Sequence, residues 1–76
     1  MHNSDVFART LKDLRTKKSL SQQQLAEQML VSRSAVSMWE LGTRLPDINM
    51  IDRLAACLDV ESRVLLDAIR GRASEL

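Results

Sequence analysis

The feature that most constrains this chain is a pair of helix-start signals that stand only eleven residues apart. In the first signal, the Ser21 hydroxyl can accept a hydrogen bond from the amide of Gln24, and the Gln24 side chain can reach back to the Ser21 amide. Leu20 and Leu25 occupy the two positions of a hydrophobic staple around this capping box. The pattern predicts a helix over residues 22–29.

The second signal repeats this arrangement at Ser32, where Val31 and Val36 occupy the staple positions. It predicts a helix over residues 33–40, and Gly42 ends that helix because glycine readily adopts the left-handed conformation that closes helices. Two short helices joined by only a few residues must cross at a steep angle.

Apolar residues with helical spacing fill the rest of the chain. Phe7, Leu11 and Leu14 lie on one face of a helix. Asp47 is a suitable cap for a later helix, and Ile48 would open the buried face of that helix. The spacing predicts three further helices, over residues 4–17, 48–58 and 62–69.

The composition fits one small all-α domain. The chain has 76 residues, of which 45% are apolar and only 3% aromatic. A core built from Leu, Val, Ile, Met and Ala suits short packed helices better than a β-sandwich. We therefore expect a single domain over residues 1–76, with an ordered core over residues 4–70. A domain of this size has a thin stability margin, which dimerisation would widen.

Charge and reactive residues exclude several classes of protein. The formal net charge is only +1, but residues 1–44 carry seven basic residues against four acidic ones, which suits one anion-facing surface. Cys57 is the only cysteine, so no intramolecular disulfide can form. It is interpreted as a small buried hydrophobe. The only histidine, His2, lies in a predicted tail, so neither a metal site nor an enzyme is expected.

No apolar run is long enough to span a bilayer, and the N-terminus lacks the apolar region of a signal peptide. These features predict a cytoplasmic protein, bacterial or phage-encoded, that does not enter a membrane and needs no cofactor.

The two central helices share an apolar seam, and the small side chain of Ala26 is placed where their backbones would meet. The seam residues are Leu25, Met29, Val31, Val36 and Trp39. This is the construction of a helix-turn-helix over residues 22–40. In that motif the first helix supports the second, and the second projects its N-terminal residues into a major groove.

This part of the chain resembles the phage repressor/Cro-type (XRE-like) helix-turn-helix transcriptional regulators in the run LSQQQLAEQMLVSRSAVSMWELGTRLPD. The run INMIDRLAACLDVESRVLL is similar to the fourth and fifth helices of that family. Together the resemblance extends over residues 11–66. It implies a compact five-helix, lambda-repressor-like DNA-binding domain that works as a homodimer on a near-palindromic operator.

One residue departs from the family pattern. Leu30 stands in the tight turn where these regulators usually have glycine. A leucine kept in the left-handed conformation costs about 1–2 kcal/mol. The alternative is a remodelled turn in which Leu30 packs against the core, and this would change the pitch of the second helix.

The resemblance implies that the second helix of the motif, over residues 33–40, is the recognition helix. Four residues on its exposed face are then expected to read bases: Arg33, Ser34, Ser37 and Met38. Arg33 can reach O6 and N7 of a guanine, or it binds only phosphate. Ser34 and Ser37 can bond to several base edges, and Ser37 can instead bond back to its own helix. Met38 suits contact with a thymine methyl, or it packs beneath the following loop.

The resemblance also implies four phosphate contacts, from Gln22, Ser32, Thr43 and Arg44. Gln22 begins the first helix of the pair, where the amide and the positive helix end favour a phosphate. Ser32 is first of all a helix cap. Arg44 is a long cation in an exposed loop and reaches phosphates easily. For Gln22 and Arg44 the alternative is a purely solvated side chain.

Other assignments are structural. Arg15 and Glu40 match a family pair that forms a largely buried ion pair between the first and third helices, and Trp39 is expected in the core. Late in the chain, apolar residues exceed what one face of a short helix needs, so some of them are expected to meet a second copy. The candidate dimer-interface residues are Leu65, Leu66 and Ile69, with Val64 beside them.

The sequence thus predicts sequence-specific binding of double-stranded DNA by a transcriptional regulator, with repression as the expected outcome. The alternative is an antitoxin-like protein-interaction module that uses the same fold on a protein partner. A long partner-wrapping extension would mark that class, and few residues follow Ile69. Within the DNA-binding class, a restriction-modification controller, a Cro-like switch protein and the DNA-binding part of a larger regulator all remain open.

Overall fold

The computed structural model describes residues 3–71, which form five α-helices and one 3-10 turn, with no strand among them. The all-α prediction is confirmed. None of the helices in this part of the chain is long and apolar enough to cross a membrane. The elements are α1 (Asn3–Lys17), α2 (Gln22–Met29), α3 (Arg33–Leu41), the 3-10 turn η1 (Ile48–Met50), α4 (Ile51–Leu58) and α5 (Ser62–Ile69).

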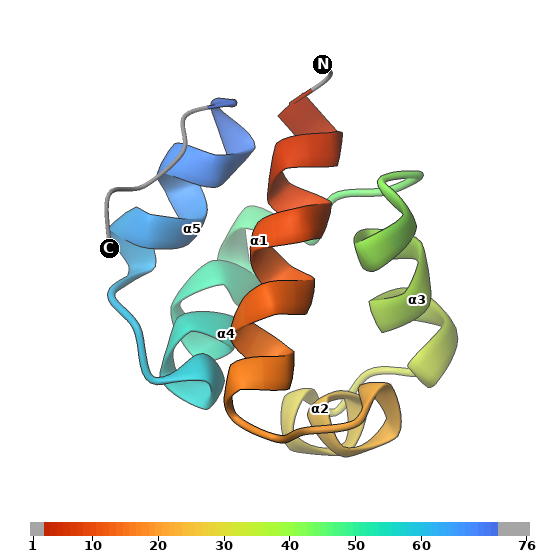
Figure 1. Cartoon of the computed structure of the whole chain (residues 1–76). Coiled ribbons are helices and arrows are strands. Elements are labelled where there is room, and N and C mark those ends of the chain that lie inside the picture. The colour runs from red at the N-terminus through yellow and green to blue at the C-terminus, as the bar shows by residue number, and fades with distance from the viewer. Residues whose placement is uncertain (1–2, 72–76) are drawn as a thin grey trace.

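α1 is the central element of the fold (Figure 1). It runs between α5 on one side and α3 on the other and packs against both, while α4 lies behind it and α2 lies below and to the right of its lower end. Every helix contributes to one apolar core, so displacing any one helix would expose that core to water. The largest fully buried side chains are Phe7, Leu11, Leu25, Met29, Val36, Ile51, Leu54 and Leu65.

Both predicted helix starts in the centre of the chain are confirmed. The Ser21 hydroxyl accepts from the Gln24 amide at 3.0 Å, and the Gln24 side chain accepts from the Ser21 amide at 2.8 Å. The Ser32 hydroxyl accepts from the Ala35 amide at 3.1 Å. Because these bonds satisfy amides that have no partner within a helix, the two serines fix where α2 and α3 begin.

The turn between α2 and α3 keeps the left-handed conformation despite its leucine. Leu30 adopts φ 59° and ψ 40°, and its amide donates to the carbonyls of Ala26 and Glu27. Its side chain is 84% exposed. Of the two alternatives for this turn, packing of Leu30 against the core is therefore wrong, and the backbone carries the cost of a left-handed residue that has a Cβ atom.

The boundaries differ from the prediction at the loop that follows α3. α3 extends one residue further than predicted, to Leu41, before Gly42 ends it with φ 77°. The Asp47 side chain accepts from the Asn49 amide at 2.9 Å, and this cap begins a 3-10 turn rather than an α-helix. The tighter winding of that turn rotates Ile48 out of the buried face. Ile48 is 68% exposed, so its predicted place in the core is wrong.

The apolar residues of α5 fall into two groups. Val64 and Leu65 are buried in the core of their own chain. Leu65 therefore has no surface to offer a partner, which corrects its assignment to a dimer interface. Leu66 and Ile69 are only half-buried and keep apolar surface that a second copy can cover.

Replacing Leu30 with glycine should stabilise the protein. The Leu30→Gly change relieves the left-handed strain and removes no buried side chain, so we expect a gain of about 1 kcal/mol in the free energy of unfolding. Leu41→Gly is the matched control, because Leu41 is 70% exposed but lies in a right-handed helix, and there glycine should cost up to about 1 kcal/mol. Urea denaturation measures both, and a loss of stability at Leu30 would contradict the strain argument.

Candidate nucleic-acid interface

α2 and α3 are joined by the predicted apolar seam. Ala26 is buried in α2, which packs against α3, in agreement with the small side chain expected between two closely packed helices. Trp39 is buried too, which confirms its assignment to the core. Of the seam residues, Leu25, Met29, Val36 and Trp39 are buried and Val31 is half-buried. The inner face of α3 is thus fixed, and its outer face is left for solvent or a ligand.

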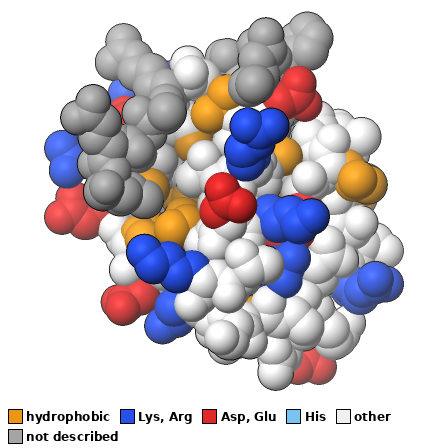
Figure 2. Space-filling view, viewed as in Figure 1, with side chains coloured by type: hydrophobic (Ala, Val, Ile, Leu, Met, Phe, Trp, Pro, Cys, Tyr) orange, Lys and Arg blue, Asp and Glu red, His pale blue; other side chains and the backbone are white. Residues whose placement is uncertain are grey.

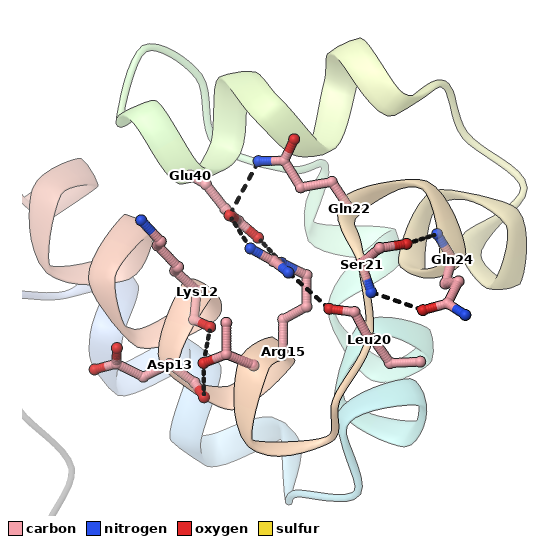
Figure 3. Close-up of polar contacts among 9 residues, drawn as sticks. Lys12, Asp13, Arg15, Leu20, Ser21, Gln22, Gln24 and Glu40 are labelled. Atoms are coloured by element: carbon pink, nitrogen blue, oxygen red, sulfur yellow. Dashed lines mark hydrogen bonds and ion pairs between the residues drawn. The ribbon is translucent and has the colours of Figure 1, made fainter.

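Arg15 of α1 and Glu40 of α3 form the predicted ion pair (Figure 3). Nε and Nη2 of Arg15 donate to the two carboxylate oxygens of Glu40 at 2.5 and 2.9 Å, and Nη1 donates to the Leu20 carbonyl at 2.7 Å. Only 10% of the Arg15 side chain and 4% of the Glu40 side chain are exposed. The hydrogen bonds to Glu40 raise the pKa of Arg15 above its ordinary value, so the guanidinium stays charged.

Gln22 extends this pair to α2 through a bond that the sequence did not predict. Its Nε2 atom donates to Oε1 of Glu40 at 3.2 Å (Figure 3). An amide nitrogen carries two hydrogens, so the second remains for another acceptor. The side chain is therefore held in one orientation at the positive end of α2, beside main-chain amides of the first helical turn.

The four predicted base-reading residues follow one side of α3. Arg33 and Ser34 lie in the first turn and are exposed, whereas Ser37 and Met38 lie one turn later and are half-buried. Because residues four apart are neighbours on a helix surface, the four side chains form one continuous strip. The N-terminal end of this strip is the most accessible. Arg33 lies there and has the longest side chain of the four and the only charged one.

The loop after α3 is closed against the end of that helix. The amide and the hydroxyl of Thr43 both donate to the Met38 carbonyl, at 3.1 and 3.2 Å. The hydroxyl hydrogen of Thr43 is thus engaged in capping α3, although Thr43 was predicted to bind phosphate. Ser32 has an analogous role, because its hydroxyl oxygen caps the start of α3. Arg44 follows in the loop as an exposed cation.

Basic and acidic side chains intermix on the face of the molecule that carries α1 (Figure 2). This face does not present a field of one sign, in agreement with the formal net charge of +1. Within residues 3–71, no three His, Cys, Asp or Glu residues gather closely enough to hold a metal ion. His2 lies outside the described residues.

The model of the helix-turn-helix family matches residues 11–65 of this chain. The matched segment contains the whole of α2, α3 and α4, together with parts of α1 and α5. The chain belongs to the helix-turn-helix family. The resemblance to phage repressor/Cro-type transcriptional regulators in this family is therefore confirmed.

Two relatives within the family are named as transcriptional regulators. HTH-type transcriptional activator BcrR of Enterococcus faecalis is 42% identical over 60 residues, which are 79% of this chain and 29% of BcrR. The uncharacterized HTH-type transcriptional regulator YqaE of Bacillus subtilis is 34% identical over 70 residues, which are 92% of this chain and 58% of YqaE. The chain spans less than two thirds of either relative, so the similarity concerns one part of each.

Solved structures of helix-turn-helix regulators share the fold. The restriction-modification controller protein C.AhdI from Aeromonas hydrophila matches with 40% identity and a TM-score of 0.76, over 82% of this chain and 94% of that chain. The clp gene regulator ClgR from Corynebacterium glutamicum matches with a TM-score of 0.81 over 93% of this chain and 76% of that chain, but at 20% identity it shows the fold alone. The compact five-helix, lambda-repressor-like fold is confirmed.

Removing one partner of the ion pair should destabilise the protein strongly. Arg15→Met leaves the Glu40 carboxylate nearly buried without its cation, which costs about 3 kcal/mol of unfolding free energy. Arg63→Met is the control, because Arg63 and Glu61 form an ion pair whose side chains are both 77% exposed, and such pairs contribute at most about 1 kcal/mol. Urea denaturation measures the free energy of unfolding of both variants. Equal losses of this free energy would show that burial of the Arg15–Glu40 pair does not increase its contribution to stability.

Proposed function

We propose that this chain is a sequence-specific, double-stranded-DNA-binding transcriptional regulator that acts as a repressor. The observation that carries the proposal is the position of Arg33 and Ser34. They are exposed at the start of a helix whose inner face is fixed by the core and whose far end is tied to α1 through Glu40. A rigid helix with a free N-terminal end is what insertion into a major groove requires.

Base reading in this proposal begins at Arg33. Its guanidinium can donate two hydrogen bonds to O6 and N7 of a guanine, and this is the commonest specific contact in the major groove. Ser34 and Ser37 add hydrogen bonds to neighbouring base edges, and Met38 meets a thymine methyl through its thioether. Half-burial of Met38 and Ser37 restricts them to bases that α3 approaches closely.

Phosphate contacts flank the recognition helix. Gln22 supplies its main-chain amide, the positive end of α2 and the second hydrogen of Nε2. Arg44 supplies an exposed cation in the loop that follows α3. The hydroxyl hydrogen of Thr43 is engaged in the cap at the end of α3, so Thr43 contributes less than Gln22 and Arg44. The Ser32 hydroxyl only accepts in its cap, so its hydrogen is available to a phosphate. These contacts set the register of the protein on DNA and carry no sequence information.

Among the regulator classes that the sequence leaves open, the similarity to C.AhdI, at 40% identity over 82% of this chain, supports a controller-like regulator. Such a protein acts in the cytoplasm, where the DNA is, and needs no cofactor to bind its site.

A homodimer completes the proposal, because two copies can read the two halves of a near-palindromic operator. Hydrophobic side chains gather where α5 approaches α1 in Figure 2, and Leu66 and Ile69 lie on α5 with part of their surface free. To read two half-sites one turn of DNA apart, the dimer must hold its two recognition helices about 34 Å apart.

Selection from a pool of randomised duplex DNA should enrich an inverted repeat. On the winning site, Arg33→Ala should relax the base preference at one position per half-site and cost about ten-fold in affinity, because it removes a bidentate contact. Arg44→Ala should instead weaken binding to all sequences and lower the slope of log affinity against log salt by about 1. Fluorescence anisotropy at several salt concentrations measures both effects.

Arg63→Ala on α5 is the matched control, because it removes an exposed cation that lies far along the chain from the helix-turn-helix. Absence of any enriched sequence, or equal effects of Arg33→Ala and Arg63→Ala, would refute groove reading and favour the protein-interaction alternative.

The dimer should depend on the half-buried residues of α5. Ile69→Lys places a charge in the proposed interface and should shift a dimer to monomer at tens of micromolar, as measured by sedimentation equilibrium. Arg63→Lys, on the same helix, is the control and should leave the mass unchanged. A wild-type protein that sediments only as monomer at that concentration would contradict the dimer.

A further inference from the structure

α4 reaches back to Met29, the last residue of α2, with two side chains. Nη1 of Arg53 donates to the Met29 carbonyl at 3.2 Å. Sγ of Cys57 lies 3.7 Å from Sδ of Met29. Because Arg53 and Cys57 are four residues apart, they stand one above the other on the same face of α4. One residue of α2 is therefore held at both its main chain and its side chain.

The cation at this end of α2 comes from outside the helix. The last four carbonyls of a helix lack partners within it, and a positive charge near them is favourable. α2 itself has no basic residue in its last turn. Arg53 thus supplies both a hydrogen-bond donor and a charge that the sequence of α2 does not provide. Cys57 is half-buried rather than buried, in keeping with a place at the edge of this contact.

Met29 stands directly before the strained turn. Leu30 takes the left-handed conformation, and the amides of Leu30 and Val31 donate back to the carbonyl of Ala26. Only Leu30, Val31 and Ser32 separate α2 from α3. With so short a connection, the orientation of the Met29 peptide bears directly on where the start of α3 lies, whereas the far end of α3 is tied to α1 through Glu40. The residue that follows the turn is Arg33, the first of the groove-facing residues.

We infer that Arg53 is a positioning residue for DNA recognition: by holding the Met29 carbonyl it fixes the left-handed turn and hence the angle at which α3 enters the groove. The inference rests on the proposed function, since it concerns how the same helix meets DNA. It assigns Arg53 no contact with DNA. An exposed arginine on this side of the molecule can alternatively bind a phosphate, and the two roles have different salt dependence.

Arg53→Met in the full chain tests this inference, because methionine keeps an unbranched stem and removes the donors and the charge. On the duplex enriched by selection, affinity should fall by up to about five-fold. Loss of one ordinary hydrogen bond lets the free protein populate other turn conformations, and binding must then reverse that shift. The slope of log affinity against log salt should stay at the wild-type value, and affinity for a random duplex should not change. Arg53→Lys retains one donor and should restore most of the specific affinity, and Arg63→Met should have no effect.

A slope that falls by about 1, with equal loss on specific and random duplexes, would make Arg53 a phosphate contact and overturn the inference. Unchanged specific affinity in Arg53→Met would overturn it as well.

Hydrogen exchange without DNA separates this inference from the proposed function. The amides of Leu30 and Val31 should exchange about five-fold faster in Arg53→Met than in Arg63→Met, because the turn has lost its anchor. If the wild-type protein selects no duplex, the proposed function fails, and exchange alone then decides whether Arg53 anchors the turn. Equal exchange in the two variants overturns the inference in either case.

Discussion

The bidentate ion pair between Arg15 and Glu40 is the interaction on which the arrangement of the helix-turn-helix depends. It joins α1 to the last part of α3, and through the Leu20 carbonyl and the Gln22 side chain it also holds the segment that leads into α2 (Figure 3). Charges that have left water need full pairing, because an unpaired buried charge is costly. The pair therefore specifies one relative position of three elements, whereas apolar packing alone tolerates small shifts.

Short-range chemistry made much of this fold predictable from the sequence. The starts of α2 and α3 follow from Ser21 and Ser32, whose capping bonds involve residues only three positions away. The end of α3 follows from a glycine. Each of these is a local hydrogen-bond or backbone preference, and such preferences can be recognised in the sequence without knowledge of the tertiary structure. The resemblance to a known family added the Arg15–Glu40 pair, which connects residues 25 positions apart.

What the sequence could not supply depends on contacts between distant elements. Leu65 and Leu66 have the same side chain, and only the packing of α5 decides that the first is buried and the second half-buried. Ile48 fits the helical spacing of α4, but the cap at Asp47 starts a 3-10 turn and rotates it into solvent. Leu30 left two turn geometries open, and Arg53 gave no local signal at all because its acceptor lies on another helix.

The mixture of charges on the surface has a consequence for how such a regulator finds its site. Attraction to random DNA grows with the number of phosphates that a protein neutralises, and it governs how long the protein stays on each wrong sequence. A protein with a net charge of only +1 gains little long-range attraction to random DNA. In the proposed regulator, this shortens each non-productive encounter and leaves a larger share of the molecules free to search. In the same proposal, discrimination between sites depends mainly on the few side chains at the N-terminal end of α3.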